Sequence, residues 1–322
     1  HGHISPHWRL CHGRQHSSRH CNTGGRPILG HCPLRNMDMD IMFSEIVFFN
    51  PVTTADRTNI ADSGLGGLTA VRELARIMPE EDLIYFGDTS RVPYGGRSRE
   101  TLVRYALQDA AFLGSFGPKA IVVACGTVSS NAMEELRTAC AVPVYGVVEP
   151  AAQAAVRTTR SGRVGVIGTE ASIRSDAYAR AVRRLCPGAE VLSVPCPLLV
   201  PLVENGRYQA EDGVVETVLE EYLAPLRIAG VDTLVLGCTH YPLLRGAIAA
   251  VMGPEVALVD VGEECARTVA EDLSRQGLRA ERTGPGSHRF YVSDSTGAFG
   301  RLATIFLGED ATGAEQVDIT AY

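Results

Sequence analysis

Two cysteines in this chain end short apolar runs and are followed at once by polar residues. Cys125 ends the stretch VVAC before Gly-Thr, and Cys238 ends LVLGC before Thr-His. A cysteine can act as a nucleophile, a metal ligand, a redox partner or a base. A redox pair is expected closer together in the sequence, zinc needs four ligands, and a nucleophile needs only one thiol. Two equivalent thiols on opposite faces of one carbon suit stereoinversion, because one removes a proton and the other delivers one.

Each thiol needs help from its surroundings to act as a base at neutral pH, because a free cysteine has a pKa of about 8.5. Backbone N–H groups at the start of a following helix would supply part of that help. His240 beside Cys238, and Asp62 in a glycine-rich turn, are the candidates for handling protons near the thiols. Four other cysteines are interpreted as small buried hydrophobic residues: Cys140, Cys186, Cys196 and Cys265.

Cofactor use is limited by the scarcity of lysine. Amino acids are commonly racemised with pyridoxal phosphate, which is held as a Schiff base on a lysine. The only lysine is Lys119, at the start of the predicted strand that ends in Cys125. It should therefore lie at the end of that strand opposite to the thiol. We expect no cofactor, and no metal either, since only His240 stands beside either thiol as a further zinc ligand.

The elements that must position the thiols alternate between strands and helices from Asn59 onward. DLIYFGD, KAIVVAC, GRVGVIGT and DTLVLGC are typical of short buried strands, and SDAYARAVRRLC is typical of a helix. Helices are also predicted from about Arg99 to Phe116 and near Asp212 to Tyr222. This alternation indicates an α/β fold with mainly parallel sheets and helices on both faces.

The pattern occurs twice, which predicts two pseudo-symmetric, doubly wound α/β domains. Each half opens with a strand and a turn of small residues, around Asp62 and around Thr169, and each later has a strand that ends in one of the two cysteines. Ligands of such sheets bind beyond the carboxyl ends of the strands. The two thiols should therefore face a common active-site cleft between the domains.

Residues 1–58 differ in composition from the rest. Residues 1–36 hold seven of the nine histidines, the single tryptophan and no acidic residue. Three Cys–His neighbours occur here without zinc-ligand spacing, although His12 and His16 could face one way on a helix. A stretch without apolar periodicity cannot offset its ordering entropy. We therefore predict a disordered or non-native leader.

The bulk composition limits the classes of partner. A net charge of −7 disfavours nucleic acid and anionic membranes as partners. The sequence has no run of about 18 apolar residues, so it predicts no membrane-spanning helix. Nine cysteines without the spacing of a small disulfide-rich domain indicate reduced thiols and a cytoplasmic protein.

Several stretches together resemble bacterial glutamate racemases, of the aspartate/glutamate racemase superfamily: ADSGLGGLTAVRELARIMP, YFGDTSRVPYGGRS, GVVEPA, VGVIGTEASI, PLVENG and LGCTHYPLL. The resemblance runs from about Asn59 to Ile319. It implies a cofactor-independent, two-thiol racemase that acts on L- and D-glutamate and supplies D-glutamate for cell-wall peptidoglycan. It also implies a homodimer, a discontinuous first domain (residues 59–149 plus 260–319) and a second domain (residues 150–259).

Carried over residue by residue, the resemblance implies that Cys125 takes the α-proton from D-glutamate and Cys238 takes it from L-glutamate. The residues implied to assist are Asp62 and Asp88 beside Cys125, and Glu204 and His240 beside Cys238. The residues implied to hold the substrate are Asp62, Ser63, Tyr94, Gly95, Gly126, Thr127, Thr239 and His240. From the residues alone, Asp62 could instead cap a helix, Asp88 could be a turn residue, and Glu204 could be a solvated carboxylate.

The chain departs from the family pattern at Gly126, where the family usually has an asparagine directly after the first cysteine. Losing one neutral hydrogen bond to the substrate would weaken binding by about 0.5–1.5 kcal/mol. Two other activities stay open: a racemase for aspartate or another acidic amino acid, and a family member that inhibits DNA gyrase by binding it. A one-thiol decarboxylase is disfavoured, because both cysteines are present.

Overall fold

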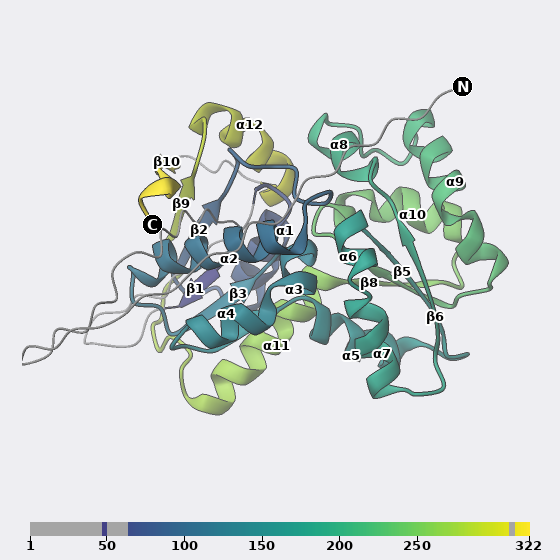
Figure 1. Cartoon of the computed structure of the whole chain (residues 1–322), viewed down its shortest axis with the longest axis horizontal. Helices are drawn as coiled ribbons and strands as arrows, with labels where there is room; N and C mark the ends of the chain where they lie inside the picture. Colours follow the sequence, from purple (N-terminus) through teal and green to yellow (C-terminus); the bar gives the residue numbers. More distant parts are fainter. Residues whose placement is uncertain (1–46, 50–63, 309–312) are drawn as a thin grey trace, which may run out of the picture. The chain divides into compact units, whose positions relative to one another are not determined.

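The computed structural model describes residues 47–49, 64–308 and 313–322, all of which belong to one compact unit, Asp40–Tyr322. This unit contains two β-sheets flanked by helices (Figure 1). The strands are β1 (Val47–Phe49), β2 (Leu83–Gly87), β3 (Ala120–Val123), β4 (Val144–Gly146), β5 (Arg163–Gly168), β6 (Glu190–Pro195), β7 (Thr233–Leu236), β8 (Ala257–Asp260), β9 (His288–Val292) and β10 (Glu315–Gln316).

Helices follow almost every strand in this part of the chain. The α-helices are α1 (Leu68–Ile77), α2 (Arg99–Gly114), α3 (Gly126–Asn131), α4 (Met133–Ala139), α5 (Val148–Thr158), α6 (Glu170–Arg174), α7 (Ala177–Leu185), α8 (Leu199–Glu204), α9 (Gly213–Ile228), α10 (Arg245–Met252), α11 (Val261–Gln276) and α12 (Thr296–Leu307). Two short 3₁₀ helices are η1 (Tyr241–Leu244) and η2 (Ile319–Ala321). None of the helices in the described part of the chain has the length and apolarity of a membrane-spanning segment.

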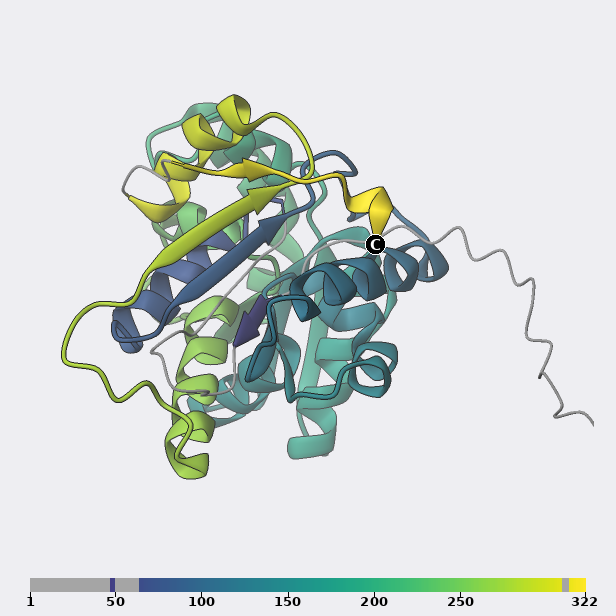
Figure 2. The ribbon, with the colours of Figure 1, turned by 90° about the vertical axis from the view of Figure 1, so that its left-hand side faces the viewer.

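The two sheets are mainly parallel, which confirms the predicted fold class. The first has the order β10-β9-β2-β1-β3-β4, and the second has the order β6-β5-β7-β8. Every pair in the second sheet is parallel. In the first sheet only the two pairings of β1 are antiparallel. Figure 2 shows helices on both faces of the first sheet, as parallel connections require.

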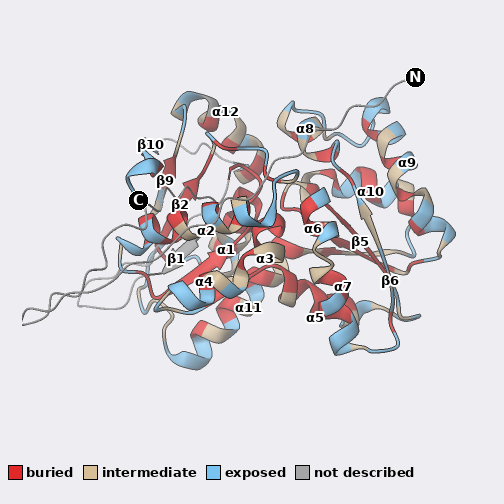
Figure 3. Cartoon of the chain, viewed as in Figure 1, coloured by how far each residue is buried: buried red, intermediate tan, exposed pale blue. Residues whose placement is uncertain are grey.

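Burial of the strands follows from this covering by helices. Every residue of β2, β3 and β7 is buried. Their sequences are continuous apolar runs, because no face of these strands meets water. Figure 3 shows the contrast between the buried strands and the exposed outer sides of the helices. The apolar runs therefore determine which segments become central strands.

Short side-chain caps fix where the helices begin. The Ser98 hydroxyl accepts a hydrogen bond from the backbone N–H of Thr101 at 3.3 Å and starts α2. The Asp212 carboxylate accepts from two backbone N–H groups at the start of α9. Both residues satisfy N–H groups that have no partner within the helix. The helices predicted near these positions are confirmed, although α9 runs beyond Tyr222 to Ile228.

The strand β1 differs from the expectation for residues 1–58. Val47–Phe49 pairs with both β2 and β3, so these three residues are part of the first sheet rather than of a disordered leader. A backbone segment between two strands gains partners for its N–H and C=O groups on both sides. The rest of the predicted leader, and the strand predicted at Asn59, lie outside the described residues.

The two predicted domains correspond in part to the two sheets. Strands of the second sheet all come from residues 163–260. Those of the first sheet come from residues 47–49, 83–146 and 288–316. The return of the chain to the first sheet through β9 and β10 fits a discontinuous first domain. The domain boundaries themselves stay a prediction, since the described residues form one compact unit.

Lys119 lies immediately before β3, at the end of the strand opposite to Cys125. Its ammonium group contacts both carboxylate oxygens of Glu81, at 3.1 and 2.9 Å, and both side chains are buried. Burial lowers the pKa of Lys119, and the contact with Glu81 partly offsets that effect. A structural ion pair therefore accounts for the only lysine of the chain.

We expect Lys119→Met to lower the free energy of unfolding by about 3–5 kcal/mol, because it leaves the Glu81 carboxylate buried without its cation. Chemical denaturation measures this loss. The double variant Glu81→Gln/Lys119→Met removes the stranded charge and should lose less than Lys119→Met alone. Equal losses in the two variants would contradict a stabilising ion pair.

Candidate active site

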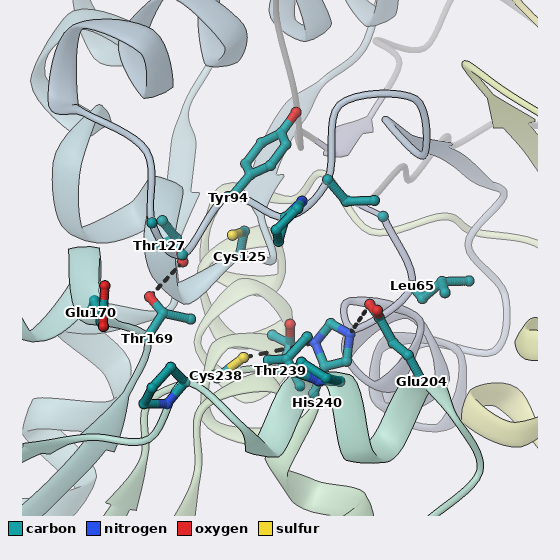
Figure 4. Close-up of a pocket in the computed structure, with 18 residues that line it drawn as sticks. Leu65, Tyr94, Cys125, Thr127, Thr169, Glu170, Glu204, Cys238, Thr239 and His240 are labelled. Atoms are coloured by element: carbon teal, nitrogen blue, oxygen red, sulfur yellow. Dashed lines mark hydrogen bonds and ion pairs between the residues drawn. The ribbon is translucent and has the colours of Figure 1, made fainter.

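A cavity of about 360 Å³ lies beyond the carboxyl ends of strands from both sheets. Its lining comes from loops that follow β2, β3, β5, β6 and β7, together with the turn at Gly64 and Leu65 that precedes α1. Figure 4 shows the labelled side chains around this space. Parallel strands direct their carboxyl ends to one edge of a sheet, which explains why segments far apart in the sequence meet here.

Cys125 enters the cavity from the first sheet. It follows β3 and occupies the N-cap position of α3, where its Sγ accepts a hydrogen bond from the backbone N–H of Val128 at 3.4 Å. Its exposed fraction is 8%. A thiol at a helix N-terminus lies where the partial positive charge of the helix favours an anion. The position therefore supports the thiolate form of Cys125.

Cys238 enters the same cavity from the second sheet, after β7. Its Sγ lies 3.7 Å from Nδ1 of His240, and its exposed fraction is 7%. Nε2 of His240 lies 3.0 Å from Oε1 of Glu204, at the end of α8. The imidazole thus connects the second thiol to a carboxylate. Figure 4 shows this row of side chains and the sulfur of Cys125 on another side of the same space.

The imidazole of His240 holds its proton strongly. Burial by itself would lower the pKa of His240, but hydrogen bonds to Cys238 and Glu204 raise it from 6.5 to about 10. Both ring nitrogens then carry protons and donate, one to the sulfur and one to the carboxylate. The protonated imidazole therefore contacts the Cys238 sulfur on one side and the Glu204 carboxylate on the other.

Hydroxyl groups line the side of the cavity near α3 and α6. Oγ1 of Thr127 and Oγ1 of Thr169 lie 2.9 Å apart, and Thr169 also caps α6 through the backbone N–H of Ser172 at 3.2 Å. Thr127 lies in the first turn of α3, which follows β3, and Thr169 lies between β5 and α6. This contact joins the two sheets beside the cavity and places two hydroxyls where a ligand can use them.

Tyr94 and Gly95 form the wall contributed by the loop after β2. The backbone C=O of Gly95 accepts from the N–H of Ala171 at 2.8 Å, and the Tyr94 hydroxyl donates to Asp88. The Asp88 carboxylate also accepts from Arg91, and from the Ser293 hydroxyl at 2.6 Å. Burial raises the pKa of Asp88, and these partners offset only part of that effect. Asp88 thus supports the wall from behind.

The structure brings together most of the residues predicted from the sequence. The predicted residues that line the cavity are Tyr94, Gly95, Cys125, Thr127, Glu204, Cys238, Thr239 and His240. Gly126 and Asp88 are not among the lining residues, and Asp88 reaches the cavity only through Tyr94. Asp62 and Ser63 lie outside the described residues.

Several lining residues were missed by the sequence analysis. Thr169 and Glu170 follow β5, and the small-residue turn there was a signal that pointed to this position. Pro197, Val200 and Pro201 form an apolar side of the cavity around α8. Nothing in their types or spacing distinguishes them from ordinary core residues, so only the tertiary structure identifies them.

The lining described by the structure contains no lysine or arginine. Its ionisable side chains other than the thiols and Tyr94 are His240, Glu170 and Glu204. Apart from the His240 imidazole, the groups of the described lining that can hold a ligand carboxylate are hydroxyls, together with backbone N–H groups such as those at the start of α3. Within the described ranges, no three His, Cys, Asp or Glu side chains converge in a way that would hold a metal ion.

This arrangement places two thiols around one small cavity, each with a nitrogen group in contact with its sulfur. The family model for Asp/Glu/hydantoin racemases matches residues 46–269. The chain belongs to this family. A glutamate racemase from Geobacter metallireducens is 50% identical over 262 residues, which cover 81% of this chain and 96% of the relative.

Solved structures of family members share the fold. A glutamate racemase from Francisella tularensis in complex with D-glutamate has a TM-score of 0.76 at 35% identity. The match covers 83% of this chain and 99% of the Francisella chain. Glutamate racemase isoform RacE1 from Bacillus anthracis has a TM-score of 0.76 at 38% identity. The match covers 80% of this chain and 95% of the RacE1 chain. The α/β architecture around the two cysteines is therefore that of known racemases.

The raised pKa of His240 predicts a pH-dependent contribution to stability. Because the folded-state pKa is about 10 and the unfolded value is 6.5, the stabilisation is fully present below pH 6.5 and is lost as the pH rises through about 10. We expect the loss of melting temperature in His240→Gln to be largest at about pH 6.5 and below, and to shrink as the pH approaches about 10.

Thermal unfolding at a series of pH values measures this deficit. Glu204→Gln removes one of the two groups that raise the pKa, so in that background the deficit should disappear at a lower pH. A deficit that does not change with pH would show that His240 is not held as a cation.

Proposed function

We propose that this chain interconverts L- and D-glutamate without a cofactor, with Cys125 and Cys238 as the two bases. The observation that carries the proposal is that both thiols line one cavity, one from each sheet. A carbon bound between them can lose a proton to one sulfur and gain a proton from the other. That exchange on opposite faces inverts the configuration at Cα.

The proton transfers balance without any external reactant. With D-glutamate, the Cys125 thiolate takes the α-proton, and the Cys238 thiol delivers a proton to the opposite face of the resulting carbanion. With L-glutamate the roles reverse. After each turnover the thiol and the thiolate have exchanged places, so the protein is ready for the opposite enantiomer. Exchange of protons with water restores the first state for another molecule of the same enantiomer.

The carbanion needs stabilisation at its carboxylate, where the negative charge develops. Hydroxyls of Thr127, Thr169 and Thr239 line the cavity with the thiols, and backbone N–H groups at the start of α3 adjoin it, so these are neutral donors for that carboxylate. Such donors are fixed before the reaction begins, so they act without reorganising. His240 would pass a proton between Cys238 and Glu204 as the charge on the sulfur changes. We keep Asp62 and Ser63 as further substrate contacts.

Glutamate is the substrate we favour because of the relatives. Curated relatives between 41% and 50% identical are named glutamate racemases, and one solved relative is in complex with D-glutamate. A cavity of about 360 Å³ is large enough for a five-carbon amino acid. The product D-glutamate would serve peptidoglycan synthesis. We further propose that the protein is cytoplasmic, since a thiol pair that must stay reduced suits a reducing compartment. We also propose a homodimer, as the resemblance to glutamate racemases implies.

Replacing either catalytic cysteine tests the two-base scheme. We expect Cys125→Ser and Cys238→Ser each to reduce net racemisation of glutamate by at least about 100-fold, because a hydroxyl is a far weaker base than a thiolate. Circular dichroism follows the inversion from each enantiomer, and the same assay with aspartate tests the choice of substrate. Full activity in either variant would remove the two-base scheme.

Matched controls are available in the same chain. Cys140 and Cys186 are half-buried thiols that do not line the cavity. Cys140→Ser and Cys186→Ser should racemise glutamate at the wild-type rate. If all four serine variants lose activity equally, the loss reflects a general effect on the protein rather than the removal of a base.

Asp88→Asn tests whether Asp88 affects substrate binding by holding Tyr94 in the cavity wall. Asparagine keeps the shape but removes the charge that accepts from Tyr94, Arg91 and Ser293. We expect KM for glutamate to rise several-fold while kcat changes less. The Tyr94 wall loses a charged hydrogen bond worth about 1.5–3 kcal/mol, and only part of this loss reaches substrate binding because Asp88 does not line the cavity. Steady-state kinetics in both directions measure the two constants. A large fall in kcat alone would place Asp88 in the proton transfers instead.

A further inference from the structure

Two glycines adjacent to the thiols bring the two cysteine loops into contact. Gly126 follows Cys125 and begins α3, and Gly237 precedes Cys238 at the end of β7. A Cβ added at Gly126 would lie 2.1 Å from the backbone carbonyl oxygen of Gly237. That separation is far shorter than van der Waals contact, so no side chain fits at residue 126 while the loops keep this position.

Space, and not backbone conformation, is what requires a glycine at residue 126. Neither Gly126 nor Gly237 is among the glycines with positive φ. The crowding continues at Gly237, where an added Cβ would lie 2.5 Å from the carbonyl oxygen of Ile167. The buried Tyr178 completes the contact, because its hydroxyl donates to the Gly237 carbonyl at 3.3 Å.

The contact between Gly126 and Gly237 is linked through short stretches of backbone to both sulfurs. Sγ of Cys125 is held by the N–H of Val128 within the first turn of α3, which Gly126 begins. The Cys238 carbonyl accepts from the N–H of Tyr241 at 3.0 Å, which fixes the loop that Gly237 enters. A displacement of one loop relative to the other therefore changes the distance between the two thiols.

We propose that Gly126 is a positioning residue for the racemisation: its missing side chain lets α3 touch Gly237, and this contact sets the separation of Cys125 and Cys238. The inference rests on the proposed two-thiol function and adds a role for a residue that does not line the cavity. A Cβ at residue 126 would force the loops apart by about 1 Å to restore ordinary contact, and misplacement by about 1 Å can cost about 100-fold in rate.

The test is Gly126→Ala in the full-length chain, assayed with L- and D-glutamate in heavy water. Inversion needs both sulfurs on one carbon, whereas exchange with retention needs only one sulfur near it. We expect inversion, followed by circular dichroism, to fall by about 100-fold. Wash-in of deuterium at Cα with retained configuration, followed by NMR, should fall less, so the ratio of exchange to inversion rises at least about tenfold.

Gly188→Ala is the matched control, because a Cβ there meets no atom within 4 Å and the residue lies outside the cavity. It should leave the ratio unchanged. Gly126→Asn introduces a larger side chain with an amide and should lose inversion at least as strongly as Gly126→Ala. A gain in kcat/KM by Gly126→Asn, or an unchanged ratio in folded Gly126→Ala, overturns the proposal.

Tyr178→Phe keeps the test decisive if Gly126→Ala does not fold. It removes the hydrogen bond to the Gly237 carbonyl without adding an atom, and we expect the ratio to rise several-fold. An unchanged ratio in that variant overturns the proposal. Failure of the wild-type chain to invert glutamate is a separate outcome, which would contradict the proposed function and not the contact between the loops.

Discussion

The carboxyl ends of parallel strands hold the two thiols across one cavity, and the rest of the site depends on that placement. Cys125 follows β3 in the first sheet and Cys238 follows β7 in the second. A thiol at the end of a buried strand has little freedom, because the strand is fixed by its neighbours and the following residues enter a helix. The distance between the sulfurs is therefore a property of how the sheets meet.

The sulfurs of the two thiols contact different kinds of hydrogen-bonding group. Cys125 caps α3 and uses the backbone N–H groups at a helix start, whereas Cys238 lies beside the imidazole of His240, which Glu204 holds from the other side. The first kind of group is a fixed dipole and the second is a titratable group. A racemase that works in both directions needs each sulfur to gain and lose a proton, and the structure meets this need with two unlike environments.

The cavity handles ligand charge without lysine or arginine in its described lining. Threonine hydroxyls and backbone N–H groups stay neutral, so they bind a carboxylate without adding a further cation to that of His240 beside Cys238. Arg91, in the loop after β2, is buried and forms an ion pair with Asp88. Arg91 and Lys119, each in a buried ion pair, are thus kept out of the cavity lining.

The sequence by itself determined the α/β class, the strands that end in Cys125 and Cys238, and the pairing of His240 with the second thiol, because apolar periodicity and short spacing are local properties. It went wrong at Val47–Phe49, since pairing between strands is not visible in a short apolar run. Only the tertiary structure placed Asp88 behind the wall and brought Gly126 against Gly237. The contacts of Asp88 with Ser293 and of Gly126 with Gly237 join residues far apart in the chain, and they depend on how strands and sheets pack.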